Sequence, residues 1–443
     1  MRPQISWSDL NSGSTVGIYG LGCEGRANLQ AALARGLDPV LVDDKPGRPN
    51  IDGRPILATI PDGLAALLRC DVVVKAPGVS RYGETVKLLQ RAGVNVVGGV
   101  GLWLQEANRS KVLCITGTKG KSTTAAIAGH LLTRLGYQCL IGGNIGLPPH
   151  GLDAAGAYDY WVIEVSSYQA TDLACSPPVV AVTSLHPDHL PWHGDVLDNY
   201  FRDKLSATSQ PGAELTVVNG DSDLLRSHDR FLGPHIKWVH SADTSDADWM
   251  TPLLLRGAHN RRNALIAQVS LLAMGVAEAS DDDQLKMAAE GFKALPSRLS
   301  IIGTVDGVTF IDDNLSTNVL PTVAAVEAFP DRRVALIVGG ESRGIDYWPL
   351  GIALRTRVTE LLLATVPDNG PDIRRQVDAA DPGNYVRTLD AADLMEAVRH
   401  GYQWARPDGI VLLSPAAPSY GQFRDYRERG AVFAAAMEAC RNY

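Results

Sequence analysis

A segment rich in glycine and lysine carries the strongest chemical signal in this sequence. Gly117-Thr-Lys-Gly-Lys-Ser-Thr123 follows an apolar run and precedes a stretch with helical character. Glycines let backbone N–H groups curl around a phosphate, and the N-terminus of a helix adds partial positive charge. Lys121 can then reach the outer phosphates, while the hydroxyl group of Ser122 or Thr123 can bind Mg²⁺. Ile115 replaces the first glycine of the full P-loop pattern, but the order of strand, loop and helix favours an ATP site over a simple turn.

Two downstream segments could complete a phosphate site. Glu164 ends the apolar run WVIE, and a carboxylate at the carboxyl end of a parallel strand can hold Mg²⁺ beside a neighbouring phosphate loop. His186, His189 and His193 follow close together. They raise the alternative of zinc, but no cysteine lies nearby and their spacing fits no common zinc site. One histidine that serves a Mg²⁺ or phosphate site is the favoured interpretation.

A second glycine-rich loop lies near the N-terminus. Gly20-Leu-Gly-Cys-Glu-Gly25 follows a strand-like run and opens a helix-like one, and Asp43 lies at the end of the next predicted strand. This arrangement matches the dinucleotide-binding pattern, which alone would indicate an NAD-dependent oxidoreductase. The pattern requires only a diphosphate near a helix N-terminus, however, and a UDP-sugar would satisfy it equally. A dehydrogenase would also leave the loop at 117–123 unexplained.

Alternating strands and helices must position both loops. Short β-branched runs such as TVGIYG (15–20), KVLCITG (111–117) and RVALIVGG (333–340) alternate with helix-like stretches along nearly the whole chain. This order predicts parallel sheets of the α/β class. The length of 443 residues suffices for about three domains. Breaks near residues 106–111 and 294–299 predict hinges, and we place three α/β domains at 1–108, 109–297 and 298–443.

Composition excludes several classes of protein. The net charge is -8, whereas a general nucleic-acid binder would be expected to carry a basic excess. The apolar runs are too short to span a membrane, and the N-terminus lacks the pattern of a signal peptide. The six cysteines are scattered without a C-x-x-C motif, which is typical of a reducing cytoplasm.

A series of short motifs, in order along the chain, resembles the Mur ligases, the ATP-dependent amide-forming enzymes of peptidoglycan precursor synthesis. Among them, the sequence is most similar to the members that add glutamate to UDP-N-acetylmuramoyl-L-alanine. The resemblance covers essentially the whole chain and rests on many motifs, which together are far more specific than any one alone. They are GLGCEG (20–25), TGTKGKST (116–123), GGNIG (142–146), EVSSYQ (164–169), HPDH (186–189), NYFRDKL (199–205), HNRRN (259–263), LPSR (295–298), DDNLSTN (312–318) and SPAAPSYGQFRDYRERG (414–430).

The resemblance implies a separate role for each of the three domains, and it implies a reaction. A Rossmann-like N-terminal domain would hold UDP, a central P-loop ATPase-like domain would hold ATP and Mg²⁺, and a Rossmann-like C-terminal domain would bring the amino acid. The carboxylate of UDP-N-acetylmuramoyl-L-alanine would attack the γ-phosphate of ATP, and the amine of the amino acid would then displace phosphate from the acyl phosphate. This chemistry depends mainly on positioning and charge neutralisation. The protein would act in cell-wall synthesis in the cytoplasm, a process linked to cell shape and cell division. It would act as a monomer.

The resemblance also assigns roles to single residues. Lys121, Glu164, His189 and Lys204 are the implied catalytic residues, and Lys204 would be carbamylated, although by itself it would be read as an ordinary helix lysine. The implied Mg²⁺ ligands are Ser122, Glu164, His189 and the carbamate. The implied ATP contacts are Gly117, Thr118, Lys119, Gly120, Lys121, Ser122, Thr123, Asn260, Asn263, Arg298 and Asp313. Those to the UDP-linked substrate are Gly22, Cys23, Glu24, Asp43, Asp44, Lys45, Gly78, Asn144, Ser166 and Gln169, and those to the amino acid are Thr317, Arg343, Ser419 and Tyr426.

The expected amino-acid pocket departs from the family pattern. Members that add D-glutamate carry D-S-K-A-T-N in the third domain, whereas here Leu315 stands in place of the lysine and Arg343 in place of a second lysine. Tyr426 replaces the usual Phe, and Asp44 and Lys45 replace the Thr and Arg expected near uracil. Leucine cannot donate to a carboxylate, and arginine offers a planar fork instead of a point charge. Together with HPDHLPWHG (186–194), this pattern resembles the branch that adds L-glutamate, after which an epimerase inverts the residue.

Four alternatives remain at this point. The same ligase could use D-glutamate if another cation replaced the missing lysine. A folylpolyglutamate synthase shares the phosphate loop, but such enzymes lack a UDP-binding first domain. An NAD-dependent oxidoreductase or a non-catalytic nucleotide sensor would require Glu164, His189 and Lys204 to be coincidental.

Overall fold

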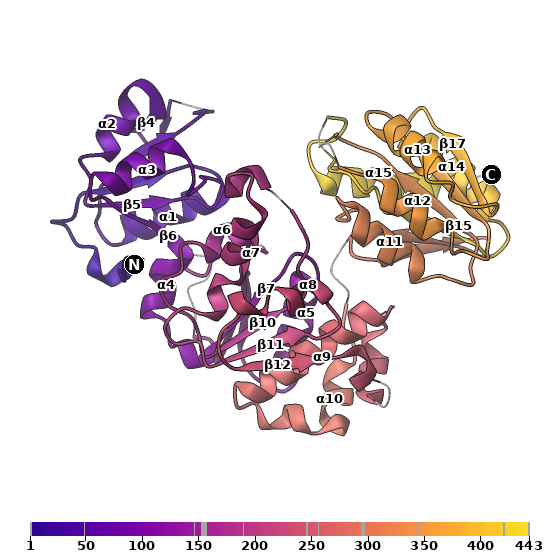
Figure 1. The fold of residues 1–443 in the computed structure, drawn as a ribbon, viewed down its shortest axis with the longest axis horizontal. Coiled ribbons are helices and arrows are strands. Elements are labelled where there is room, and N and C mark those ends of the chain that lie inside the picture. The colour runs from indigo at the N-terminus through magenta and orange to yellow at the C-terminus, as the bar shows by residue number, and fades with distance from the viewer. Residues whose placement is uncertain are drawn as a thin grey trace. The chain divides into compact units, whose positions relative to one another are not determined.

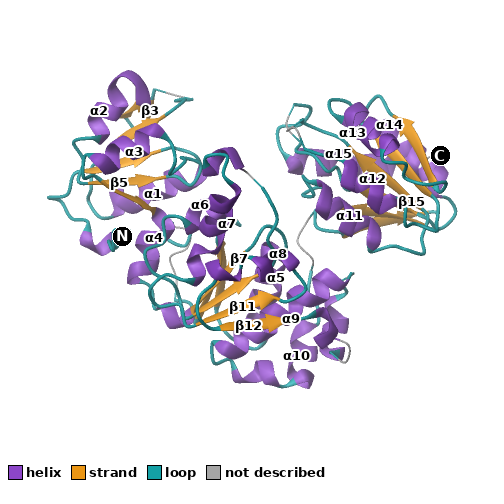
Figure 2. Ribbon diagram, in the orientation of Figure 1, coloured by secondary structure: helices purple, strands orange, loops and turns teal. Residues whose placement is uncertain are grey.

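In the part of the chain that the computed structural model describes, three six-stranded sheets accompanied by helices form the framework of the protein (Figure 1, Figure 2). This confirms the predicted α/β class. The structure describes residues 2–47, 49–145, 147–151, 157–188, 190–244, 247–255, 257–293, 297–342, 345–419 and 421–441. The three sheets lie within residues 1–108, 109–297 and 298–443, while the domain boundaries at these residues stay predictions.

The N-terminal sheet has the strand order β3-β4-β2-β1-β5-β6, and its pairs are parallel except β3 with β4. The order reverses at β1, which lies between β2 and β5. In α/β sheets, ligands bind beyond the carboxyl ends of strands at such a point. The strands are β1 (Val16–Tyr19), β2 (Val40–Asp43), β3 (Asn50–Ile51), β4 (Arg54–Ala58), β5 (Val72–Lys75) and β6 (Asn95–Gly98), and the helices are α1 (Cys23–Ala34), α2 (Leu64–Leu67), α3 (Glu84–Arg91) and α4 (Gly99–Glu106).

The central sheet is parallel throughout, with the order β12-β11-β10-β7-β9-β8. Strand β7 lies between β10 and β9, so the loops that follow these three strands meet at one edge. The strands are β7 (Val112–Thr116), β8 (Cys139–Gly143), β9 (Tyr160–Glu164), β10 (Val179–Val182), β11 (Leu215–Asn219) and β12 (Ile236–Val239). The helices are α5 (Lys121–Arg134), α6 (Ser167–Ala170), α7 (Leu197–Leu205), α8 (Asp223–Ser227), α9 (Ala258–Ala273) and α10 (Asp282–Ala289).

The C-terminal sheet has the order β13-β14-β18-β15-β16-β17, in which only β13 with β14 is antiparallel. Its strands are β13 (Ser300–Val305), β14 (Val308–Asp312), β15 (Val334–Val338), β16 (Leu361–Thr365), β17 (Val386–Asp390) and β18 (Ile410–Leu413). Its helices are α11 (Val319–Glu327), α12 (Trp348–Leu354), α13 (Gly370–Ala379), α14 (Leu394–Ala405) and α15 (Tyr426–Cys440).

Strand β15 shows why these parallel strands read as continuous apolar runs. Leu336 packs in one cluster with residues of α11, α12 and α13, whereas Ala335 and Ile337 pack in another with residues of α14 and α15. Both faces of the strand are therefore buried by helices. Fully burying a leucine or isoleucine side chain stabilises a fold by about 1.5–3 kcal/mol, which favours β-branched and aliphatic residues at every position.

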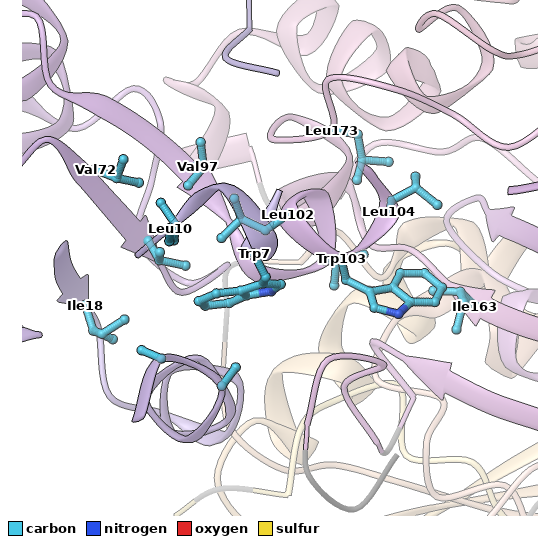
Figure 3. Packing of buried hydrophobic residues seen from close by; sticks show 14 of the residues in the cluster. Trp7, Leu10, Ile18, Val72, Val97, Leu102, Trp103, Leu104, Ile163 and Leu173 are labelled. Carbon is cyan, nitrogen blue, oxygen red and sulfur yellow. The ribbon is translucent and has the colours of Figure 1, made fainter. Parts of the chain in front are cut away.

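The first two sheets share one hydrophobic cluster. It runs from Ile18 and Val97 of the first sheet through Trp103 of α4 to Ile163 of β9 and Leu173 (Figure 3). By its contacts the chain divides into two compact units, the first Met1–Leu254 with Asn260–Phe292 and the second Leu255–His259 with Lys293–Tyr443. The two N-terminal sheets thus belong to one unit, and the hinge expected at residues 106–111 stays a prediction. Within the described parts of the chain, no helix is both long and apolar enough to cross a membrane.

Candidate active site

The phosphate loop connects β7 to α5 and depends on two glycines. Gly117 and Gly120 have φ values of 135° and 90°, which side chains disfavour. A Cβ atom at Gly117 would lie 2.3 Å from Oγ1 of Thr183, and one at Gly120 would lie 2.8 Å from Oδ1 of Asn263. Both conformation and space therefore require glycine. The contact with Asn263 also places the start of α9, where the buried Asn260 lies as well, against this loop.

Glu164 makes polar contacts with several side chains around the phosphate loop. Its Oε2 accepts a hydrogen bond of 2.6 Å from the hydroxyl of Ser122, and its Oε1 accepts one of 2.7 Å from Nδ2 of Asn144. Nζ of Lys121 lies 3.9 Å from Oε1 and donates to the carbonyl oxygen of Thr118. A hydroxyl and a carboxylate are the hard oxygen ligands that Mg²⁺ prefers, so this pair fits the cation that the sequence predicts.

Lys204 is buried at the end of α7, which overturns the view of it as an ordinary exposed lysine. Its Nζ donates to the carbonyl oxygen of Gly117 at 3.2 Å and lies 5.1 Å from the centre of the Tyr200 ring. Burial, and then the charge of Lys121, hold the pKa of Lys204 well below its usual value. A neutral amine is the form that can add carbon dioxide, so this environment suits carbamylation.

His189 lies outside the described residues, so its predicted role as a Mg²⁺ ligand stays a prediction. Within the described part of the chain there is no group of three or more His, Cys, Asp or Glu side chains that could hold a metal. His193, one of the histidines behind the zinc alternative, is fully buried and bonded instead to Asp203 and Ser167.

A cleft of about 310 Å³ lies at the carboxyl end of the N-terminal sheet. A second hollow of about 400 Å³ shares Leu21, Gly22 and Asp43 with it and is also lined by Lys45. Gly22 is the N-cap of α1, and no atom would lie within 4 Å of a Cβ there, so the helix N-terminus is open to a ligand. The cleft is lined by Gly20, Leu21, Gly22, Cys23, Glu24, Asp43, Asp44, Ala76, Pro77, Gly78 and Val79.

The two aspartates of this cleft already have partners. Asp43 accepts hydrogen bonds of 2.7 Å from the backbone N–H of Leu21 and 2.9 Å from that of Lys45. Asp44 accepts bonds from the hydroxyl groups of Tyr19, at 2.7 Å, and Thr59, at 2.6 Å. Both carboxylates thus hold the walls of the cleft in place.

Glu24 connects the cleft to the turn after β9. Its Oε2 accepts a hydrogen bond of 2.8 Å from Nε2 of Gln169. Oε1 of Gln169 in turn accepts from the backbone N–H of Ser166 at 2.9 Å and from its hydroxyl at 3.1 Å. Burial raises the pKa of Glu24 to about 7, against the opposing effect of the Gln169 hydrogen bond. A continuous polar chain therefore links residues predicted to bind the two ends of one substrate.

The raised pKa of Glu24 predicts a pH-dependent stability. The folded state binds more protons at this site than the unfolded state between pH of about 4.5 and 7, so this contribution to the free energy of unfolding falls as pH rises through that window. We expect Glu24→Gln to gain thermal stability relative to the unsubstituted protein as pH rises from 5 to 8, measured by differential scanning fluorimetry. The exposed Glu214→Gln variant is the control, and a difference for Glu24→Gln that stays constant with pH would contradict the assignment.

The remaining predicted ATP contacts lie in the second compact unit. Asp313 is buried after β14 and accepts hydrogen bonds from Ser414, at 2.7 Å, and from the backbone N–H of Leu299, at 3.1 Å. Burial raises its pKa to about 6. Arg298, which is half-buried, lies between Ser297 and Leu299, whose φ values are 60° and 50°. The segment thus holds a strained backbone beside a predicted binding residue.

Arg429 connects the loops that carry the predicted amino-acid contacts. Its guanidinium is buried and donates to the backbone carbonyls of Asn314, Gly339 and Ala417, and burial lowers its pKa to about 10. Asn314 also donates to the carbonyl oxygen of Tyr426. The three loops supported in this way lead to Thr317, Ser419 and Arg343, of which Arg343 lies outside the described residues.

Sequence reasoning missed several residues that organise the site. Arg429 lies within a recognised motif, RDYRERG, but only its burial reveals its role. Asp203 directly precedes Lys204, yet its partners Tyr82 and His193 come from separate segments. No spacing pattern predicts the contact of Asp203 with Tyr82, which lies 121 residues away in the sequence.

Two family models match separate parts of the chain. Residues 115–252 match the family model described as the Mur ligase middle domain, and residues 297–417 match that of the Mur ligase glutamate ligase domain.

Two curated proteins match the chain over nearly its whole length. Both are named UDP-N-acetylmuramoyl-L-alanine–L-glutamate ligase. The protein from Micromonospora sp. is 38% identical over 97% of each chain, and that from Salinispora tropica is 39% identical over 97% of this chain and 98% of its own. Among solved structures, the MurF ligase from Thermotoga maritima in complex with ADP covers 99% of this chain and 100% of its own, with a TM-score of 0.55 and 14% identity. At that identity the likeness shows a common fold.

Proposed function

The chain belongs to the Mur ligase family, and we propose that it joins L-glutamate to UDP-N-acetylmuramoyl-L-alanine while ATP is converted to ADP and phosphate. Family membership makes it an ATP-dependent amide ligase and replaces the oxidoreductase interpretation of the N-terminal loop. The observation that carries the proposal is the group of Ser122, Asn144 and Lys121 around Glu164, beside a glycine loop that opens a helix. The names of the two curated relatives support L-glutamate as the incoming amino acid.

The first step forms an acyl phosphate. The backbone N–H groups of the loop at 117–120 and the ammonium group of Lys121 hold the phosphates of ATP. The alanine carboxylate of the substrate attacks the γ-phosphorus, and ADP leaves. Mg²⁺, when held by Ser122, Glu164, His189 and carbamylated Lys204, would supply positive charge beside the phosphate oxygens. The alanine carboxylate would be oriented by Asn144, Ser166 and Gln169. Their contribution to the rate would come mainly from holding the carboxylate in position for attack.

The second step forms the amide. The neutral amine of glutamate attacks the acyl carbon, phosphate leaves, and the amine loses a proton. Thr317, Arg343, Ser419 and Tyr426 would hold the amino acid, while Asn260, Asn263, Arg298 and Asp313 would contact ATP. Exclusion of water from the acyl phosphate is needed because hydrolysis competes with this step. We further propose a cytoplasmic monomer whose product passes to an epimerase in cell-wall synthesis.

An isotope experiment tests the reaction. UDP-N-acetylmuramoyl-L-alanine labelled with ¹⁸O in its carboxylate is incubated with ATP, Mg²⁺ and L-glutamate, and the released phosphate is analysed by mass spectrometry. We expect one ¹⁸O atom in each phosphate and a product heavier by one glutamyl residue. Phosphate without label, or release that does not depend on the UDP-linked substrate, would contradict the mechanism.

Leu315 and Arg343 should set the choice between the enantiomers of glutamate. Glutamate carries two carboxylates, each of which needs a cationic or multi-donor partner in a partly desolvated pocket. Moving these anchors changes which enantiomer directs its amine at the acyl phosphate. We therefore expect Leu315→Lys together with Arg343→Lys to raise the ratio of kcat/KM for D-glutamate over L-glutamate by about tenfold or more, a difference of about 1.4 kcal/mol. An unchanged ratio in an active double variant would show that other residues decide.

A further inference from the structure

A short helical turn, Leu190–His193, contacts both the cleft at the carboxyl end of the N-terminal sheet, which we call the UDP cleft, and helix α7, which carries Lys204. Nε1 of Trp192 donates to the carbonyl oxygens of Pro77, at 3.0 Å, and Gly78, at 3.2 Å. Pro77 and Gly78 line the cleft at the end of the N-terminal sheet. The wall of the cleft is therefore attached to the segment that follows His189.

His193, the next residue, has a polar side-chain contact at each ring nitrogen inside the central domain. Its Nδ1 lies 2.6 Å from Oδ2 of Asp203, and its Nε2 lies 3.1 Å from the hydroxyl of Ser167. Asp203 directly precedes Lys204 in α7, and Ser167 directly follows Ser166. All three side chains are buried, with exposed fractions of 0% for His193, 4% for Ser167 and 6% for Asp203.

Tyr82 completes the connection from the N-terminal domain. Its hydroxyl donates to Oδ2 of Asp203 at 2.9 Å, the same oxygen that faces His193. Ser80, two residues earlier, donates to the carbonyl oxygen of Trp192 and accepts from the backbone N–H of Tyr82. The ring of Tyr168 stacks on Trp192 with centroids 4.4 Å apart.

We propose that Tyr82, Trp192 and His193 are positioning residues that couple occupancy of the UDP cleft to the placement of Lys204 and of the Ser166–Gln169 turn. We call Tyr82, Trp192, His193, Asp203 and Ser167 the coupling cluster. A ligand that fixes the walls of the cleft restrains Gly78, and the cluster transmits that restraint to α7 and α6 through hydrogen bonds. The bonds of Trp192 and Tyr82 are exposed or part-buried, whereas those of His193 to Asp203 and Ser167 are buried, where hydrogen bonds are strong. UDP binding then orders the phosphate-transfer site before ATP reacts.

This inference rests on the proposed function only in taking UDP as the ligand of the cleft. The inference assigns to the coupling cluster a role in transmitting ligand binding, in addition to holding the N-terminal and central domains together. Adhesion alone would make the protein less stable when the cluster is weakened, but it would not make α7 respond to a ligand in the cleft. The response of α7 is therefore the decisive observation.

Hydrogen–deuterium exchange of the full-length protein, with UDP alone as the probe, tests the coupling. In the unsubstituted protein we expect saturating UDP to slow exchange of the amides in α7 by about threefold or more. Tyr82→Phe and Trp192→Phe each keep an aromatic ring but lose the donor. We expect the double variant to bind UDP with a Kd within about threefold of the original, as seen by calorimetry, but to lose the protection of α7.

Tyr137→Phe is the matched control, because Tyr137 also donates from its hydroxyl to a carboxylate, that of Glu278 at 3.1 Å, outside the cluster. It should retain full protection. Turnover provides a second readout: the double variant should lose about three- to tenfold in kcat, with the KM for ATP unchanged. Full protection of α7 in the double variant, or UDP binding without protection in the original protein, would overturn the coupling alone. No UDP binding to the original protein would overturn the coupling and the proposed function together.

Discussion

Replacement of Lys121 by alanine should lower kcat by about 10²-fold or more while the fold is retained. Lys121 opens α5 at the phosphate loop, and its Nζ lies 3.9 Å from Glu164. It supplies the cation that neutralises charge on the transferred phosphoryl group, and preorganised charge of this kind contributes a few kcal/mol to a transition state. Steady-state phosphate release with all three substrates measures the effect.

The control for Lys121→Ala is Lys87→Ala. Lys87 lies on α3 of the N-terminal domain, in an exposed ion pair with Glu84, and such pairs contribute little to stability. Equal melting temperatures for both variants would show that any loss of activity is chemical. Near-normal turnover in Lys121→Ala would refute its role in phosphate transfer.

Replacement of Lys204 by alanine should leave almost no activity, and added short carboxylic acids should restore part of it. Alanine cannot form a carbamate, and the deleted side chain leaves a buried space beside the carbonyl of Gly117 in which a small carboxylate can lie. Acetate or formate would then stand in for the carbamate as an anionic oxygen ligand. The measurement is kcat as a function of acid concentration at fixed ionic strength.

Two comparisons make the rescue specific. Lys121→Ala lacks a different group, so the same acids should not restore it. Chloride at equal ionic strength should leave Lys204→Ala inactive. Full activity of Lys204→Ala without any acid would contradict the carbamate assignment.

The sequence predicts the buried centre of each sheet better than its edges. The run RVALIVGG contains β15, in which every residue is apolar because helices cover both faces. In contrast, β17 at the edge of the same sheet has the sequence VRTLD and is only partly buried. Its polar residues interrupt the apolar pattern by which a strand is identified in the sequence. β13 is similarly half-exposed and pairs antiparallel. Edge strands receive fewer apolar contacts, and the pattern that identifies a strand weakens accordingly.

In the candidate site, too, some features are predictable from the sequence and others are not. The glycines of the phosphate loop and Glu164 at the end of β9 are predictable because local backbone conformation and strand ends determine their positions. The burial of Lys204 is not predictable from residue spacing alone, because the sequence DKL reads as an exposed helix end. The contact of Tyr82 with Asp203 requires two domains to pack together, and no local pattern contains that information.

The most direct test of the central claim is the stereochemistry of the product. The enzyme is supplied with UDP-N-acetylmuramoyl-L-alanine, ATP, Mg²⁺ and racemic glutamate, the product is purified and hydrolysed, and the enantiomers of the released glutamate are separated by chiral chromatography. We predict a clear excess of L-glutamate, in agreement with the substitution of Leu315 and Arg343 for the two lysines of the D-glutamate pattern. An excess of D-glutamate would contradict this account.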